Sequence, residues 1–112
     1  MLARAHRILS GDDYRRVVRR GRRTPTRVAV IYRAPSPEPG ARPRFGLIVS
    51  GQVGNAVHRN RVRRRLRAIC ASSLSMPLTG DIVIRALPAA SDADWDTLRA
   101  EIDGGLRRVV TA

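Results

Sequence analysis

The chain has 112 residues, 43% of them hydrophobic, and carries 22 basic residues against nine acidic ones, a formal net charge of +13 at pH 7. This length fits one domain rather than two, and the hydrophobic content excludes a disordered basic tail. No apolar run approaches the ~20 residues of a membrane-spanning helix, and the N-terminus lacks the apolar stretch of a secretory signal. The single Cys70 excludes an internal disulfide and a multi-cysteine metal site. These limits favour a soluble cytosolic domain that binds a polyanion.

The positive charge is concentrated in the first part of the chain. Residues 1–68 hold 18 of the 22 basic residues, all of them arginine, and three of the acidic residues. Residues 69–112 hold four arginines and six acidic residues. The net charge is therefore +15 in the first part and −2 in the second. The first part is expected to contact the polyanion, and the second resembles an ordinary scaffold.

The first predicted element is a short helix over residues 10–20. Ser10 is a candidate N-cap, the two aspartates that follow it suit the positive end of a helix, and Gly21 is well placed to end it. Two strands are predicted next, over residues 27–33 and 44–50, because their residues are mostly apolar and β-branched. Four prolines between these strands predict an exposed loop over residues 34–43.

The longest predicted helix spans residues 56–73, with Asn55 as its N-cap, because its apolar residues share one arc and its arginines lie opposite. A third main strand is predicted over residues 81–86. A final helix runs from about residue 92 to 109, with an apolar stripe that begins at Trp95. The order helix, strand, strand, helix, strand, helix predicts an α+β fold, a small α-β sandwich with helices packed on a mixed sheet.

The start of the longest helix carries the strongest functional signal. Arginine near a helix N-terminus faces the positive end of the helix dipole, and like charges four residues apart repel each other. An anionic partner removes both penalties, and the free N–H groups of the first turn can also bind phosphate. The pattern therefore predicts phosphate binding, with a merely solvated face as the alternative. The residues concerned are Arg59, Asn60, Arg61, Arg63, Arg64, Arg65 and Arg67.

These residues also resemble a known family. The motif Arg59-Asn60-Arg61, followed by Val62 and further basic residues, is similar to the signature of the protein subunit of bacterial ribonuclease P. Matching segments flank it in the same order as in that family. They are an acidic-aromatic helix start at residues 12–14, an Arg-Phe-Gly-Leu-Ile-Val-Ser strand at 44–50, and an Asp-Ile-Val-Ile-Arg-Ala strand at 81–86.

The resemblance implies a fold and an activity. The strand-helix-strand connection of that family is a left-handed β-α-β crossover. Its catalyst is a large RNA that uses Mg²⁺, bound mainly by RNA, to remove the 5′ leader from precursor tRNA, and the protein binds both that RNA and the leader. By this resemblance the chain holds no catalytic residue and no metal ligand, and works in the cytoplasm. Its expected partners are one catalytic RNA per chain and precursor tRNA, with no membrane and no further protein.

The resemblance also assigns site residues by position. The catalytic RNA is expected to contact Asn55 and the seven residues named above. A cleft between the first helix and the sheet is expected to hold the single-stranded leader, lined by Tyr14, Val18, Val30, Tyr32 and Ser50. The whole chain, residues 1–112, is expected to form one RNA-binding domain, with a flexible basic segment at residues 1–9.

Two other functions fit the charge. A ribosomal or other structural RNA-binding protein would share the general topology but would lack the motif centred on Asn60. A DNA-binding module could place the long helix in a major groove, although no dimerising element supports it. Among single residues, Cys70 and Trp95 are predicted to be buried core. Tyr14 is either core or half-exposed, and His58 either touches RNA or packs inward.

Overall fold

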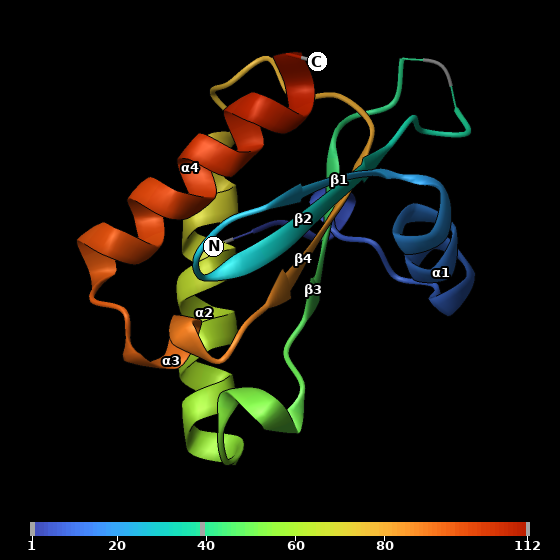
Figure 1. The fold of residues 1–112 in the computed structure, drawn as a ribbon. Helices are drawn as coiled ribbons and strands as arrows, with labels where there is room; N and C mark the ends of the chain where they lie inside the picture. The colour runs from blue at the N-terminus through green and yellow to red at the C-terminus, as the bar shows by residue number, and fades with distance from the viewer. Residues whose placement is uncertain (1, 39, 112) are drawn as a thin grey trace.

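The computed structural model describes residues 2–38 and 40–111, so residue 39 of the proline-rich loop and the two terminal residues lie outside the described part. Figure 1 shows one four-stranded sheet with helices on both of its faces, in the strand order β1-β2-β4-β3. The elements in chain order are η1 (Arg4–His6, a 3₁₀ turn), α1 (Gly11–Arg20), β1 (Arg22–Pro25), β2 (Ala29–Ala34), β3 (Arg44–Ile48), η2 (Gly51–Val53, a 3₁₀ turn), α2 (Ala56–Ser73), β4 (Asp81–Ala86), α3 (Ala89–Asp92) and α4 (Trp95–Thr111).

The predicted α+β sandwich is confirmed, and both predicted helix starts have the expected caps. The Ser10 hydroxyl accepts a hydrogen bond from the Asp13 N–H at 3.1 Å, at the start of α1. The Asn55 side-chain oxygen accepts from the His58 N–H at 3.1 Å, at the start of α2. Such bonds satisfy N–H groups that have no partner within the helix, which is why these residue types mark helix starts in a sequence.

Several elements differ from the sequence prediction. β3 ends at Ile48, two residues earlier than predicted. β1 was not predicted, because its four residues, Arg-Arg-Thr-Pro, show no apolar alternation and pair only with β2 at the sheet edge. β2 begins two residues later than predicted, since the Thr26 hydroxyl accepts from the N–H groups of Val28 and Ala29 and bends the chain there. The last predicted helix is α4, which begins three residues later than predicted because Asp94 caps the Thr97 N–H at 2.7 Å, and the short α3 before it was not predicted.

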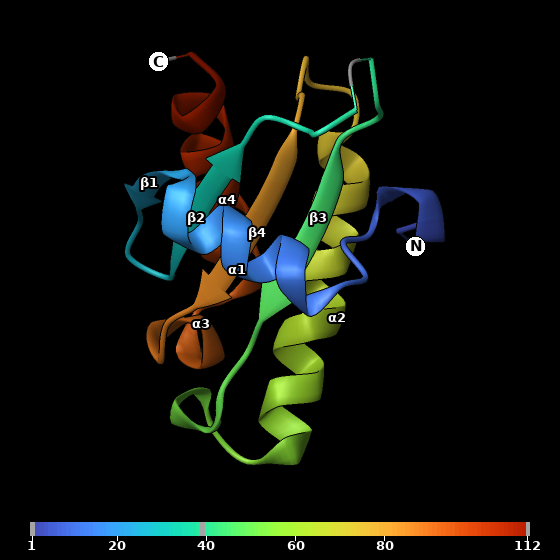
Figure 2. The same cartoon turned by 90° about the vertical axis from the view of Figure 1, so that its right-hand side faces the viewer.

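The chain enters β4 through a crossover of unusual hand. β3 and β4 are parallel neighbours joined by α2, whereas β2 pairs antiparallel with both β1 and β4. In Figure 2 both parallel strands run downward, α2 lies behind the sheet, and β4 lies to the left of β3. This arrangement is a left-handed crossover, as the family resemblance implies, whereas about 98% of such connections are right-handed.

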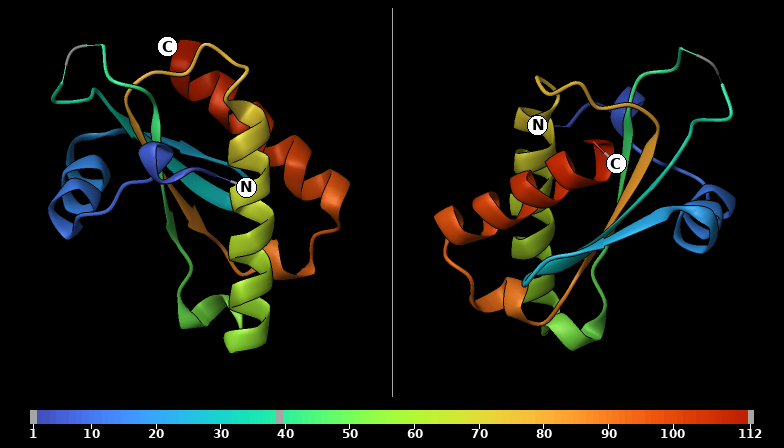
Figure 3. Two further views of the ribbon diagram at one scale, coloured as in Figure 1. Left: turned by 180° about the vertical axis from the view of Figure 1, so that it is seen from behind. Right: turned by 45° about the horizontal axis from the view of Figure 1, so that its top comes forward.

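The main core lies between the sheet and the layer formed by α2 and α4, which Figure 3 shows from behind. Leu66 and Ile69 of α2 and Leu98 of α4 are fully buried there. Cys70 is buried as predicted. The prediction for Trp95 is wrong, since 38% of this residue is exposed. Trp95 is the first residue of α4, and the buried stripe of that helix begins one turn later at Leu98.

Among the described helices, α1 crosses the strands on the opposite face of the sheet (Figure 2), and Ile8 of the N-terminal segment packs beside it. Val17 is fully buried against the sheet, in a second core cluster with Tyr32 and Val83. The Tyr14 ring lies directly over Gly46 of β3, and its hydroxyl accepts a hydrogen bond from the Leu47 N–H at 3.1 Å. Because one short helix cannot cover four strands, part of this face stays open.

Residues 2–9, expected from the sequence to be flexible, lie along the free edge of β3. The Ile8 N–H donates to the Phe45 carbonyl at 2.8 Å, and Arg7 forms a parallel bridge with the same residue. Leu2 and Ile8 are buried. The N-terminal segment is therefore bonded to β3, and Figures 2 and 3 show it running from beside α2 to the start of α1.

The contact between Tyr14 and Gly46 can be tested by Gly46→Ala. A methyl group at this position would lie 2.5 Å from the Tyr14 ring. We expect the substitution to lower the free energy of unfolding by about 1–3 kcal/mol, the usual cost of overpacking, as measured by urea denaturation. Gly51→Ala is the matched control, because its added methyl group would meet no atom within 4 Å. The loss in the free energy of unfolding caused by Gly46→Ala should be smaller when Tyr14 is also replaced by alanine. If the loss is the same in both backgrounds, the Tyr14 ring is not what the added methyl group meets.

Candidate nucleic-acid interface

The arginines of α2 form the largest concentration of unneutralised charge among the described residues. Arg61, Arg64 and Arg67 are exposed, and no ion pair joins any α2 arginine to a carboxylate within the described residues. The first turn of α2 contains no acidic residue. Like charges held this close destabilise a folded chain, so the arrangement suits a surface that meets a polyanion.

Two of the predicted RNA-binding arginines are also tied to the protein. Arg63 donates to the Asn60 side-chain oxygen at 3.1 Å and to the Val49 carbonyl at 3.4 Å. Arg65 donates to the Ala93 carbonyl at 3.2 Å, between α3 and α4. Both are partly buried. Their guanidinium groups brace α2 against its neighbours, whereas Arg61, Arg64 and Arg67 present their charges to solvent.

The remaining predicted residues of this surface lie at the N-terminus of α2. Asn60 is exposed beside Arg63. Arg59 is partly buried, and its Nε atom is buried with no hydrogen-bond partner among the described residues. Asn55 accepts from the His58 N–H and lies 2.8 Å from His58 Nδ1. His58 is exposed, so the structure does not place it in the core.

A groove runs beside α1 over the uncovered part of the sheet. One hollow of about 240 Å³ is lined by Tyr14, Arg15, Val18, Arg19 and Ile48. A second hollow of about 500 Å³ adjoins it at Ile48 and continues past Ser50 and Arg85 to Leu87. Together they make a path with an apolar floor and arginines on its sides. We call this path the α1 groove.

Some of the predicted cleft residues line the α1 groove, and the others are buried beneath it. Tyr14, Val18 and Ser50 line the α1 groove. Val30 and Tyr32 are buried, with only 3% and 6% of their surfaces exposed, and they form part of the core beneath α1. The structure thus brings these five residues to one face of the sheet but leaves three of them open to a ligand.

The most notable residue that sequence reasoning missed is Arg85. It is exposed on the central strand β4, and its guanidinium carbon lies 6.0 Å from the centre of the Tyr32 ring. The strand register places Arg85 between Val30 of β2 and Ile48 of β3. A signal was present in the sequence, because an arginine inside an apolar central strand must reach solvent through one face of the sheet.

An ion cluster around the buried Asp81 holds α1 in this position. Asp81, at the start of β4, is fully buried and accepts two hydrogen bonds from Arg44 of β3, at 2.9 and 2.8 Å. It also accepts from Arg16 of α1. Asp13 of α1 lies within 3.5 Å of both arginines. The hydrogen bond to Asp81 is the main cause of the raised pKa of Arg44.

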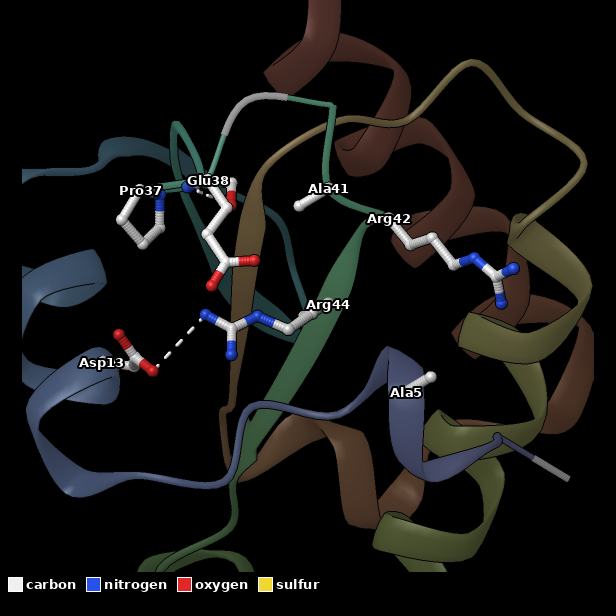
Figure 4. A pocket seen from close by; sticks show the side chains of 8 residues that line it. Ala5, Asp13, Pro37, Glu38, Ala41, Arg42 and Arg44 are labelled. Atoms are coloured by element: carbon white, nitrogen blue, oxygen red, sulfur yellow. Dashed lines mark hydrogen bonds and ion pairs between the residues drawn. The ribbon is translucent and has the colours of Figure 1, made fainter.

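The proline-rich loop adds a hollow of about 370 Å³ beside this cluster. Figure 4 shows the Asp13 and Glu38 carboxylates close to Arg44, with Arg42 further along the wall. Two carboxylates among the lining residues disfavour a polyanionic ligand. This hollow is therefore a poor candidate for the RNA interface.

No catalytic or metal centre was assigned from the sequence. In residues 2–38 and 40–111, no three His, Cys, Asp or Glu side chains gather where they could hold a metal ion. The described helices include none that is both long and apolar enough to cross a membrane.

Comparisons with known proteins agree on one family. The sequence pattern of the family described as Ribonuclease P matches residues 2–110. The ribonuclease P protein component of Clavibacter michiganensis is 51% identical over 98% of this chain and 97% of its own length. That of Acidothermus cellulolyticus is 44% identical over 97% of this chain and 92% of its own. The solved Staphylococcus aureus RNase P protein superposes with a TM-score of 0.86, at 28% identity, over 96% of this chain and 97% of that one.

The ion cluster predicts how stability changes with acid. Burial by itself would raise the pKa of Asp13, but the Ser10 hydrogen bond and the charges of Arg44 and Arg16 outweigh it, so its pKa is lowered. Asp13 therefore stabilises the fold above its ordinary pKa of 3.8, and this contribution is lost as the pH falls through the lower folded value. Urea denaturation of the wild type and Asp13→Asn between pH 7 and pH 2 should show a difference that shrinks in acid. A constant difference would contradict this assignment.

Proposed function

This chain belongs to the ribonuclease P protein family, and we propose that it meets the two RNAs of this enzyme on two separate surfaces. It is the protein component of an endoribonuclease that matures the 5′ end of tRNA, and its partner is the RNA subunit. The alternative of a structural RNA-binding protein without a role in cleavage is not supported, since the matching relatives are named as ribonuclease P components.

The first surface is the arginine face of α2, which we assign to the catalytic RNA. The observation that carries this assignment is the absence of any carboxylate partner for Arg61, Arg64 and Arg67 within the described residues. Phosphate groups would neutralise these charges, and Arg can contact two phosphate oxygens at once. Arg59 and Asn60 extend the surface toward the helix N-terminus, where Asn55 forms the cap.

The second surface is the α1 groove, which we assign to the 5′ leader of precursor tRNA. Unpaired bases bind well on aromatic and apolar side chains, and Tyr14, Val18 and Ile48 supply such a floor. Arg15, Arg19 and Arg85 stand where the leader phosphates would pass. Val30 and Tyr32 support the floor from below. A groove that takes bases by stacking is tolerant of sequence, as a leader-binding site must be when leaders differ.

Several features of the working enzyme are further parts of this proposal. As the family resemblance implies, the Mg²⁺ ions are held mainly by RNA phosphates. One chain joins one catalytic RNA in the cytoplasm, without a membrane or another protein. The chain contributes no reacting group, and its role is to raise affinity for the precursor and to help metal ions bind to the RNA.

The proposed function has a direct test. The purified chain is combined with a bacterial ribonuclease P RNA and precursor tRNA at low Mg²⁺, and release of the 5′ leader is measured. We expect faster release than with the RNA alone, because the protein neutralises phosphate charge and holds the leader. No enhancement at saturating protein would overturn the proposal.

The role of α2 is tested by the salt dependence of binding to the catalytic RNA. The triple variant Arg61→Gln, Arg64→Gln, Arg67→Gln should lower the slope of log K against log[salt] by up to ~0.7–0.9 for each phosphate that the variant no longer neutralises. A control with equal reduction of charge replaces Arg42, Arg99 and Arg107, which lie on the proline-rich loop and α4. If both triple variants change the slope equally, net charge rather than the α2 face is responsible.

The role of the α1 groove is tested with Arg85→Gln. Removal of a charge-assisted hydrogen bond of about 1.5 kcal/mol should weaken the affinity of the holoenzyme for precursor tRNA about tenfold. Its affinity for mature tRNA, which has no leader, should not change. Arg99→Gln on α4 is the single-charge control. Equal decreases for precursor and mature tRNA would remove Arg85 from the leader path.

A further inference from the structure

A fourth hollow lies between the N-terminal segment and α2, and it shares Tyr14 with the α1 groove. It has a volume of about 190 Å³ and is lined by Leu2, Arg7, Ile8, Leu9, Tyr14, Phe45, Leu47, Arg63 and Arg67. Figures 2 and 3 show residues 2–9 running from beside α2, past β3, to the start of α1. We call it the three-arginine hollow, after Arg7, Arg63 and Arg67.

The walls of the three-arginine hollow are held in place by hydrogen bonds to the backbone. The Ile8 N–H donates to the Phe45 carbonyl at 2.8 Å, and Arg7 Nε donates to the Leu2 carbonyl at 2.9 Å. On the far side, Arg63 is anchored to the Val49 carbonyl. The hollow is therefore preformed before any ligand binds.

Its charge is not balanced by the protein. None of the nine lining residues is acidic, and none of the three arginines forms an ion pair within the described residues. This contrasts with the hollow of Figure 4, where carboxylates face Arg44. Three guanidinium groups around one small space create a strongly positive potential, which is suited to a phosphate group.

The same hollow exposes an unusual apolar surface. Leu9 is 59% exposed, and Leu47 and Tyr14 are only partly buried beside it. An apolar patch next to a cluster of arginines matches the two chemical features of a nucleotide, which carries a flat base and a phosphate. The volume is below the about 300–1,000 Å³ typical of sites for drug-sized ligands, so it suits one base rather than a larger molecule.

We propose that the three-arginine hollow binds one unpaired ribonucleotide, with its phosphate between Arg7, Arg63 and Arg67 and its base against Leu9 and Leu47. This inference rests on the proposed function of the chain as the partner of a catalytic RNA. The nucleotide can come from two RNAs, because Arg67 belongs to the α2 face and Tyr14 also lines the α1 groove. The chemistry is the same for both sources, and the experiment separates them.

The test compares Arg7→Gln and Leu9→Ala with Arg4→Gln. Arg4 lies in the same segment and is exposed, but it does not line the hollow, so its replacement removes one charge without touching the site. If the nucleotide belongs to the catalytic RNA, both test variants bind that RNA at least about fivefold more weakly than Arg4→Gln does, the smallest effect expected when one base is no longer held. If it belongs to the leader, the catalytic RNA binds equally, and the preference for precursor over mature tRNA falls about fivefold.

A crosslinking experiment tests directly whether RNA lies next to Leu9. A photoreactive group on Leu9→Cys should crosslink to RNA in the assembled holoenzyme, and Ala100→Cys on the exposed side of α4 is the control. Labelling is confined to the introduced thiol, because Cys70 is buried and this burial raises its pKa to about 12.

The outcomes separate this inference from the proposed function. It is overturned if Arg7→Gln and Leu9→Ala match Arg4→Gln in both affinities and Leu9→Cys crosslinks no more than Ala100→Cys. Since Leu9 is largely exposed, Leu9→Ala removes little packing, so a folding defect cannot hide the result. Failure of the wild-type chain to enhance leader release would instead overturn the proposed function itself.

Discussion

The position of α1, and with it the shape of the α1 groove, depends on one buried carboxylate. Asp81 has no exposed surface and is bonded by Arg44 from β3 and Arg16 from α1. Burying a carboxylate such as Asp81 has a desolvation cost of several kcal/mol, so the cluster around it is a poor way to gain stability. What it provides is position, because it fixes α1 across the sheet at one end of β4. The other end of the same strand is left uncovered, and there Arg85 and Ile48 reach solvent beside the helix.

Arginine has two opposite roles in this chain. Arg16 and Arg44 are surrounded by carboxylates and hold elements of the fold together. Arg61, Arg64 and Arg67 have no such partners among the described residues, and their repulsion is relieved only when a polyanion binds. The protein therefore keeps unfavourable positive charge on α2 and on the wall of the three-arginine hollow. Phosphate groups of a bound RNA would neutralise this charge. The acidic residues that could neutralise it are instead placed mainly in α1, β4 and α4.

Local chemistry explains which elements could be predicted from the sequence. Ser10 and Asn55 mark helix starts because their side chains cap free N–H groups, and both caps are present. The interpretation failed where the surroundings of an element decide the outcome. β1 is a strand only because β2 pairs with it, and Trp95 is exposed because Asp94 starts α4 at that residue. Arg85 was overlooked because its strand is otherwise apolar, and only the register shows which neighbours it has.

Residue identities and their spacing alone indicated a polyanionic partner and a basic helix suited to contact it. Net charge, its concentration before residue 69 and the motif around Asn60 follow from residue identity and spacing along one helix, which need no knowledge of the rest of the fold. The tertiary structure alone decided which side chains share a surface. It separated Val30 and Tyr32 from the open groove, added Arg85 to it, and brought Arg7 to the same hollow as Arg63 and Arg67. The physical reason is that a groove is the space left between packed elements, so its lining depends on crossing angles, register and crossover hand that no local pattern records.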